Sequence, residues 1–249
     1  MKYYSTRDKA HARPCSLREA VEAGASVIDV GGYSSRPGAD EVSPEEEWRR
    51  VDLGVGAVRS LSPDLPVSID TFRSSVAARA IHKYGKVIIN DISAGELDPL
   101  IVDVAAEHDV PYVAMHMKGD PRTMQSMTDY RDIVAEVVDY FRERTAQLRE
   151  RGVRRIVVDP GFGFAKTLEQ NYELLRGLHR LAELGYPVLA GVSRKSMIYK
   201  LLGTTPAEAL NGTTALHWEC LRQGAAILRV HDTREAVEVV RMFDQFMQA

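Results

Sequence analysis

The sequence contains little cysteine, few aromatic residues and no long apolar run. Its two cysteines, Cys15 and Cys220, lie far apart and in no metal-ligand or CxxC spacing, which excludes a disulfide scaffold and a cysteine-based zinc site. No apolar run approaches the roughly 18 residues of a membrane-spanning helix. The start, MKYYSTRDKAHARPC, is basic but is not followed by an apolar segment, so it does not resemble a signal peptide. We therefore expect a cytoplasmic protein with no membrane partner.

An excess of basic charge is also missing. The chain has 32 basic and 35 acidic side chains and a net charge of −3, and its basic residues form no continuous stripe along the sequence. Proteins that bind nucleic acids usually carry such an excess or stripe, so we expect no nucleic-acid partner. The content of 45% hydrophobic and 27% charged residues is typical of a globular protein, and 249 residues suit one large domain. We therefore assign residues 1–249 to a single domain.

Short β-branched runs alternate with amphipathic stretches along the chain. The runs are continuously apolar, which is the pattern of parallel strands covered on both faces. This repetition predicts an α/β fold, a TIM (β/α)8 barrel, with an open doubly wound sheet as the alternative. No GxGxxG follows the first run, which weakens the alternative, and GFGFAKT at 161–167 lacks P-loop spacing. The predicted strands are Ser26–Val30, Pro66–Ile69, Val87–Asn90, Pro111–Met115, Arg155–Val158, Pro187–Ala190 and Ala226–Val230. The predicted helices are Thr6–Ala23, Ser43–Leu61, Ser74–Tyr84, Asp98–His108, Tyr130–Arg151, Thr167–Leu184, Pro206–Gln223 and Thr233–Met247.

These predictions give seven strands for eight helices, so the first strand of the barrel is expected to be missing. Residues 1–24 form an atypical N-terminal segment in which Pro14 interrupts the helical pattern. A barrel open at one position exposes the edges of the two neighbouring strands. We therefore expect low stability, aggregation, or an edge that another chain covers.

Polar residues follow nearly every predicted strand. Active sites of such barrels form at the C-terminal strand ends, although any single Asp there is more often a helix cap or turn residue. Carboxylates and an amide can read the paired N–H groups of a flat heterocycle, while cationic side chains can hold an anion. No Ser–His–Asp or Cys–His order indicates a nucleophile, which favours direct displacement. The residues that support this chemistry are Asp70, Asn90 and Asp159 for the heterocycle and Lys195, Ser196, Arg229 and His231 for the anion.

Seven segments in order resemble the dihydropteroate synthase family, the folate-pathway enzymes inhibited by sulfonamides. They extend over nearly all of residues 25–232, and they are ASVIDVGGYSSRPGAD, VSIDTFR, IINDISAGE, MHMKGDPRTMQ, VVDPGFGFAKT, GVSRKSMI and LRVHD. The resemblance implies a transferase of folate biosynthesis. Its reaction joins 6-hydroxymethyl-7,8-dihydropterin diphosphate with p-aminobenzoate and gives 7,8-dihydropteroate and pyrophosphate.

The resemblance also implies roles for individual residues. The pterin is expected to contact Asp70, Asn90, Met115, Asp159, Phe164 and Lys195. The p-aminobenzoate subsite is expected at Ser35, Arg36, Pro37, Lys195 and Ser196, and pyrophosphate at Arg229 and His231. Of all these, Lys195, Arg229, His231 and Asp70 are expected to be catalytic. Mg²⁺ is the implied cofactor, and a homodimer formed through helices late in the barrel is the implied assembly.

The sequence departs from the family pattern at three places. Ser35 stands for a usual Thr and keeps the hydroxyl, while Ala165 stands for a usual Gly, which matters little if the backbone there is not left-handed. The family motif xGILNVTPDSF is absent, so its Mg²⁺-binding Asn has no counterpart and we assign no metal ligand. We therefore expect either a truncated or a diverged form of the family. Two alternatives stay open: a pterin-binding module of a methyltetrahydrofolate methyltransferase type, and a truncated non-catalytic barrel.

Overall fold

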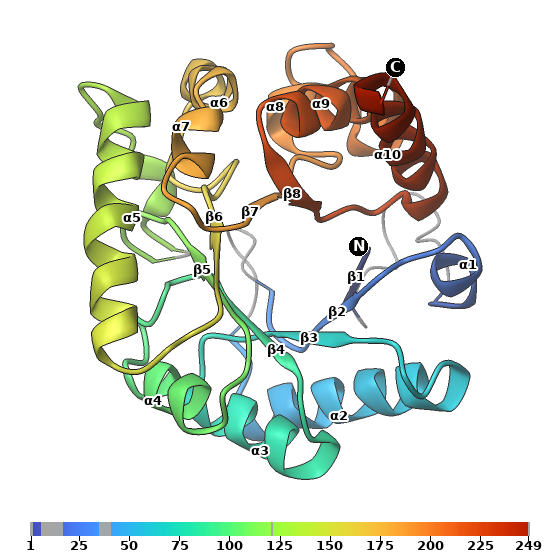
Figure 1. The fold of residues 1–249 in the computed structure, drawn as a ribbon, viewed down its shortest axis with the longest axis vertical. Helices are drawn as coiled ribbons and strands as arrows, with labels where there is room; N and C mark the ends of the chain where they lie inside the picture. The colour runs from blue at the N-terminus through green and yellow to red at the C-terminus, as the bar shows by residue number, and fades with distance from the viewer. Residues whose placement is uncertain (1, 6–16, 35–40, 121, 249) are drawn as a thin grey trace.

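Eight parallel strands form one curled sheet surrounded by helices (Figure 1). The structure is a computed structural model and describes residues 2–5, 17–34, 41–120 and 122–248. Each strand pairs with the next along the chain, in the order β1 to β8, as in a TIM-type barrel. The strands are β1 (Lys2–Ser5), β2 (Ile28–Gly31), β3 (Val67–Asp70), β4 (Ile88–Asp91), β5 (Tyr112–Met115), β6 (Ile156–Asp159), β7 (Val188–Ala190) and β8 (Ala225–Leu228).

Helices follow the strands and cover the outside of the sheet (Figure 1). The α-helices are α1 (Leu17–Glu22), α2 (Pro44–Leu61), α3 (Ser74–Tyr84), α4 (Leu100–Glu107), α5 (Ile133–Glu150), α6 (Leu168–Arg176), α7 (His179–Ala182), α8 (Ser196–Tyr199), α9 (Leu210–Arg222) and α10 (Thr233–Gln248). Two short 3₁₀ helices are η1 (Met124–Ser126) and η2 (Pro206–Glu208). The predicted α/β class is confirmed, since strands and helices alternate along the described chain, and the curled parallel sheet is consistent with a TIM-type barrel.

The first strand is the main correction to the sequence analysis. Residues 2–5 form β1, which pairs in parallel with β2, from Lys2 opposite Ile28 to Ser5 opposite Gly31. The expectation of a missing first strand is therefore not confirmed, and the edge of β2 is paired. Within the described residues no ladder joins β8 to β1.

Local sequence signals explain where the helices begin. The Ser43 side chain accepts a hydrogen bond from the Glu46 N–H (3.2 Å), and Pro44 occupies the first helical position of α2. Thr167 and Gln170 form a reciprocal capping box at the start of α6. Strands β2, β5 and β7 are buried along their whole length, as their continuous apolar runs predict.

Two predicted helices are interrupted in the structure. The stretch 167–184 divides into α6 and α7 around Gly177, where an added Cβ would lie 2.7 Å from the side chain of Val134 on α5. The stretch 206–223 begins as the 3₁₀ turn η2 and becomes α9 only at Leu210. The first helix is interrupted where it packs closely against α5, and the second is shortened because its first residues form a capped 3₁₀ turn.

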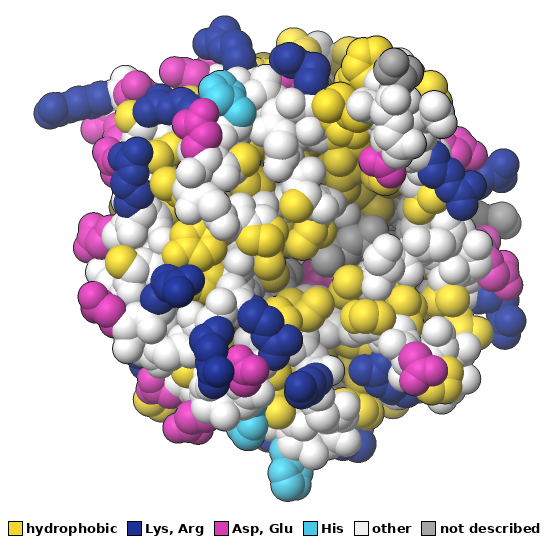
Figure 2. All heavy atoms as spheres, in the orientation of Figure 1, with side chains coloured by type: hydrophobic (Ala, Val, Ile, Leu, Met, Phe, Trp, Pro, Cys, Tyr) yellow, Lys and Arg dark blue, Asp and Glu magenta, His cyan; other side chains and the backbone are white. Residues whose placement is uncertain are grey.

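Charged side chains lie mostly around the periphery of the face shown in Figure 2, and hydrophobic side chains lie closer to its middle. This distribution follows from the amphipathic helices, which turn their apolar sides toward the sheet. Across the described part of the chain, every helix is too short or too polar to cross a membrane.

Candidate active site

The strand register places the predicted pterin residues at one rim of the barrel. Asp70 on β3 lies opposite Asn90 on β4, and Met115 on β5 lies opposite Asp159 on β6. Asn90, Met115 and Asp159 are buried and Asp70 is partly buried. Since the strands are parallel, their carboxyl ends meet at the same side of the sheet. The structure thus brings these four predicted residues together.

Asp29 on β2 belongs to the same cluster, although the sequence analysis gives it no role. Its Oδ2 accepts a hydrogen bond from Nδ2 of Asn90 (2.9 Å), which fixes the orientation of the amide. Asp29 Oδ1 and Asn90 Oδ1 are buried and make no hydrogen bond within the protein. Burial raises the pKa of Asp29, while the charge of Arg229 acts in the opposite direction. Buried acceptors without partners are costly, so their presence favours a ligand that supplies donors.

Arg229, just after β8, lies against these carboxylates. Its Nη2 is 2.9 Å from Oδ2 of Asp159, and its side chain is 14% exposed. Burial alone would lower the pKa of Arg229, but the charges of Asp159, Asp29 and Asp70 raise it above its usual value. Burial and the neighbouring Asp29 raise the pKa of Asp70 well above its usual value. The site therefore pairs its buried acidic wall with Arg229, the arginine that the sequence predicts to bind pyrophosphate.

Lys195 approaches the same region from the loop after β7. Its Nζ donates a hydrogen bond to the carbonyl oxygen of Phe162 and lies 4.9 Å from the centre of the Phe164 ring. Burial, with the charge of Arg229, lowers the pKa of Lys195 to about 7, although Asp159 opposes this shift. Lys195, Arg229 and Asp159 thus share one electrostatic environment, and Phe164 lies beside them.

Lys166 is a buried cation that the sequence analysis does not assign. Its Nζ lies 2.9 Å from the carbonyl oxygen of Phe164, 3.1 Å from that of Gly161 and 3.1 Å from Nδ1 of His116. Burial lowers the pKa of Lys166 to about 7, and burial together with Lys166 lowers the pKa of His116 well below its usual value. Lys166 therefore holds the loop that carries Phe164. The sequence signal that could have identified Lys166 is its position in the glycine-rich segment GFGFAKT, which does not have P-loop spacing.

Ala165, in the same loop, has the left-handed backbone in which the sequence analysis expected the replacement of glycine to matter. Its φ is +50°, which is the left-handed conformation that favours glycine. The replacement of a usual glycine there is therefore strained rather than neutral. The Ala165 side chain is buried in a small apolar cluster with Ile92, Met115, Met117 and Met124, and Phe72 and Phe164 pack against this cluster.

The loop after β3 is anchored by a buried carboxylate on α2. Glu47 accepts hydrogen bonds from Oγ1 of Thr71 (2.5 Å) and from the guanidinium of Arg73. Gly32 lies in the loop after β2, and an added Cβ on it would lie 2.4 Å from the carbonyl oxygen of Glu47. The loop after β2 therefore passes directly over α2. Ser35, Arg36 and Pro37, the predicted p-aminobenzoate residues further along this loop, lie outside the described residues.

His231 and Ser196 lie at the outer part of the rim. The Ser193 hydroxyl accepts a hydrogen bond from the backbone N–H of His231 (3.1 Å) and lies 3.0 Å from Nδ1 of its exposed ring. Ser196 is the first residue of α8 and is partly buried. Both residues therefore border the region of Lys195 and Arg229, and their substrate-binding roles stay predictions.

A protein-held metal ion does not fit the described part of this site. In those ranges no three His, Cys, Asp or Glu side chains are grouped so that they could hold one. The unpartnered acceptors Asp29 Oδ1 and Asn90 Oδ1 are two oxygens beside an arginine, which is a poor setting for a cation. The described side chains therefore supply no site for a resident metal ion.

Comparison with known proteins identifies the family. The profile described as "Pterin binding enzyme" matches residues 8–231. The dihydropteroate synthase of Synechocystis is 41% identical over 97% of this chain and 85% of that protein, and the Escherichia coli K12 enzyme is 43% identical over 92% and 81%. The chain belongs to the dihydropteroate synthase family.

Solved structures of dihydropteroate synthases share the fold of this family member. The Thermus thermophilus enzyme in complex with 4-aminobenzoate has a TM-score of 0.89 at 38% identity, covering 98% of this chain and 93% of that one. The Yersinia pestis enzyme in a sulfonamide complex has a TM-score of 0.91 at 33% identity, covering 99% and 92%. The enzyme class predicted from the sequence, a transferase, is thereby confirmed.

Proposed function

We propose that this chain condenses 6-hydroxymethyl-7,8-dihydropterin diphosphate with p-aminobenzoate, giving 7,8-dihydropteroate and pyrophosphate in folate biosynthesis. The observation that carries the proposal is the juxtaposition, at one rim, of buried or partly buried acceptors and two partly buried cations. Asp70, Asn90 and Asp159 form the acceptor wall, and Lys195 and Arg229 face it. The relatives solved with 4-aminobenzoate and with a sulfonamide support the second substrate and sulfonamides as inhibitors.

The acceptor wall suits the pterin. A carboxylate accepts two parallel N–H bonds in one plane, which matches the amino and ring N–H groups of the heterocycle. Asp29 holds the Asn90 amide so that Oδ1 can accept a further donor. Met115 and Phe164 supply apolar contact for the ring faces, and Lys195 donates toward the ring from the opposite wall.

The cationic groups suit the leaving group. The bond between the pterin methylene carbon and the diphosphate oxygen breaks, and its electron pair leaves with pyrophosphate. The amine of p-aminobenzoate forms the new C–N bond and releases one proton. We propose that Arg229 leaves Asp159 and binds the diphosphate when the substrate enters the site. We propose that His231 binds the same group. Cations placed at developing negative charge lower the barrier of the reaction. Lys195 and Ser196, with Ser35, Arg36 and Pro37, would hold p-aminobenzoate.

Mg²⁺ is proposed as part of the substrate rather than as a resident cofactor. Mg²⁺ usually keeps several waters and binds through substrate phosphates with one or two carboxylates. A magnesium diphosphate complex therefore needs no cage of protein ligands. A chelator should lower the apparent affinity for the pterin diphosphate and leave the affinity for the pterin ring alone unchanged.

We also propose a cytoplasmic homodimer. Met242, Phe246 and Met247 on α10 are each 66% exposed, and Phe246 and Trp218 of α9 form one aromatic surface, with ring centroids 5.6 Å apart. Apolar patches of this kind are typical of protein–protein contacts. The buried free thiol of Cys220 suits the reducing conditions of the cytoplasm.

Turnover with both substrates tests the proposed function. Mass spectrometry should detect 7,8-dihydropteroate only when the pterin diphosphate, p-aminobenzoate and Mg²⁺ are all present, and a sulfonamide should suppress it. Pterin binding without any product would contradict the proposal and favour the methyltransferase-type module instead. Absence of pterin binding would favour the non-catalytic barrel.

A further inference from the structure

Arg194 and Lys195 are consecutive residues that leave β7 in opposite directions. Arg194 has a φ of +53°, the left-handed conformation that non-glycine residues rarely adopt. The backbone N–H of Lys195 bonds to the Val192 carbonyl oxygen (3.1 Å), which closes the tight turn. As a result the Lys195 side chain reaches the carbonyl oxygen of Phe162 in the site, while Arg194 faces α9 and η2.

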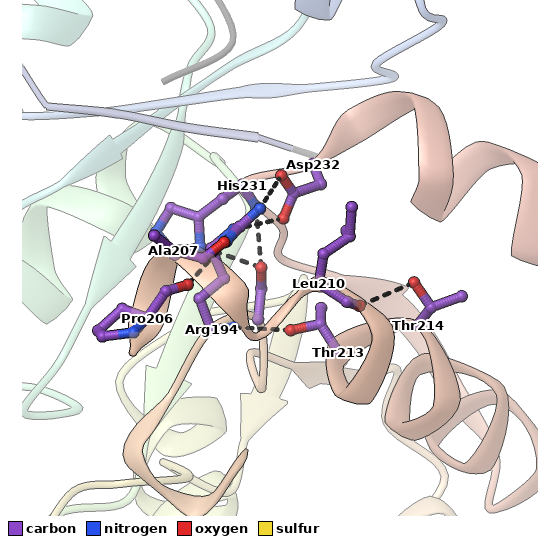
Figure 3. Close-up of polar contacts among 9 residues, drawn as sticks. Arg194, Pro206, Ala207, Leu210, Thr213, Thr214, His231 and Asp232 are labelled. Atoms are coloured by element: carbon purple, nitrogen blue, oxygen red, sulfur yellow. Dashed lines mark hydrogen bonds and ion pairs between the residues drawn. The ribbon is translucent and has the colours of Figure 1, made fainter. Parts of the chain in front are cut away.

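The Arg194 guanidinium is held by contacts from two separate segments, and the Arg194 backbone is held by a third (Figure 3). It forms a two-point ion pair with Asp232, with Nε 2.8 Å from Oδ2 and Nη2 2.9 Å from Oδ1. Its Nη1 donates to the carbonyl oxygens of Pro206 (2.7 Å) and Ala207. The Arg194 backbone N–H donates to Oγ1 of buried Thr213 on α9 (3.0 Å).

The position of this ion pair connects two parts of the candidate site. Arg194 directly precedes Lys195, and Asp232 directly follows His231. The hydroxyl of Ser193 makes a second connection, because it bonds to the backbone N–H of His231 and contacts its ring nitrogen Nδ1. The loops after β7 and β8 are thus tied together on their outer side.

We propose that Arg194 is a positioning residue that couples the p-aminobenzoate side of the site to the pyrophosphate side. The inference rests on the proposed function. The two-point pair fixes the separation of the loop carrying Lys195 and Ser196 from the loop carrying Arg229 and His231. The contacts of the guanidinium offset the strained backbone that directs Lys195 inward. Arg194 does not itself touch the reacting atoms.

Kinetics of single and double variants test this role. Arg194→Ala and Asp232→Asn should each lower kcat/KM by about 10- to 100-fold, because displaced groups lose their alignment. The double variant should lose no more than the worse single variant, since both changes break one connection. Arg142→Ala is the matched control: Arg142 pairs with Asp139 on α5 at 2.6 Å, and both side chains are more than 60% exposed. It should leave kcat/KM within about twofold.

Arg194→Gly separates positioning from stability. Glycine accepts the left-handed backbone, so this variant should melt at a higher temperature than Arg194→Ala while being equally slow. Recovery of wild-type kcat/KM by Arg194→Gly, or additive losses in the double variant, would overturn the inference. Should Arg194→Ala not fold, Arg194→Lys takes its place in both comparisons. An inactive wild type would instead contradict the proposed function, so the two failures are distinct.

Discussion

Two aspartates on strands of the sheet, Asp29 on β2 and Asp91 on β4, take different roles in this molecule. Asp91 accepts hydrogen bonds from the backbone N–H groups of Ser93 (2.8 Å) and Gly95 (2.6 Å), so it caps a turn. Asp29 instead orients the amide of Asn90 and keeps one oxygen unpartnered. The sequence cannot separate the two roles, because the difference lies in which neighbours the fold places around each carboxylate.

Lys166 makes stability depend on pH. Its pKa of about 7 in the folded protein lies below its ordinary value of 10.5. Between these values the unfolded chain binds a proton that the folded chain has lost, so this residue makes the free energy of unfolding rise with pH. Lys166→Met should remove this contribution and flatten the slope by up to about 1.4 kcal/mol per pH unit between pH 7 and 10.

Urea denaturation at several pH values measures that slope. Lys86→Met is the control, since Lys86 is an exposed lysine and its substitution should leave the slope unchanged. Lys166→Met also leaves the carbonyl oxygens of Gly161 and Phe164 without their donor, so its stability should be lower than that of the wild type at pH 10, and the difference should shrink as the pH falls toward 7. An unchanged slope in Lys166→Met would contradict the assigned pKa.

At the scale of helices and strands, the sequence predicts the elements whose position depends on a local pattern of apolar residues. The predicted strands from Ser26–Val30 onward lie within one or two residues of β2 to β8, because each is a bounded apolar run. The break between α6 and α7 was not predicted, since it depends on the approach of Val134 to Gly177. The four-residue helix α8 was not predicted either, because so short a segment has no helical period.

Two glycines on α2 test how closely this helix packs on β2. A Cβ on Gly54 would lie 2.6 Å from Cγ1 of buried Val30, whereas the nearest atom to a Cβ on Gly56 is the Tyr84 hydroxyl at 3.9 Å. Gly54→Ala should therefore destabilise the protein by about 1–3 kcal/mol through overpacking. Gly56→Ala should stabilise it by about 0.5–1 kcal/mol, because alanine favours the helix.

Denaturant unfolding of the two alanine variants gives both values under the same conditions. The paired substitutions have the same chemistry and the same helix, so only the surroundings of the added methyl group differ. Equal effects of the two substitutions would show that α2 does not approach β2 as closely as described.

At the scale of the whole molecule, the barrel class and the family could be predicted and the strand count could not. The residues of β1, KYYS, carry no run of aliphatic side chains, and their strand identity comes from pairing with β2. Pairing is a tertiary contact that no local pattern encodes. The site was predicted as a set of residues, but the pairing of Arg229 with Asp159 depends on the placement of β6 and β8 on either side of β7.

The proposed dimer is tested by mass in solution. Light scattering should give about twice the chain mass of 27.7 kDa. Met242→Glu should dissociate the dimer, because a charge would be buried in an apolar contact. Leu53→Glu on α2 alters a residue of similar exposure, 58%, and should leave the mass unchanged. A wild type of single-chain mass at all concentrations would contradict the dimer.

The most direct test of the central claim is the rate of dihydropteroate formation in the wild type and in Asp159→Asn. Asp159 lies in the acceptor wall and pairs with Arg229, and asparagine keeps its size while removing its charge. The wild type should form 7,8-dihydropteroate and pyrophosphate in equal amounts, and Asp159→Asn should lower kcat/KM by about 100-fold or more. An inactive wild type with both substrates and Mg²⁺ present, or an Asp159→Asn variant as fast as the wild type, would contradict the account.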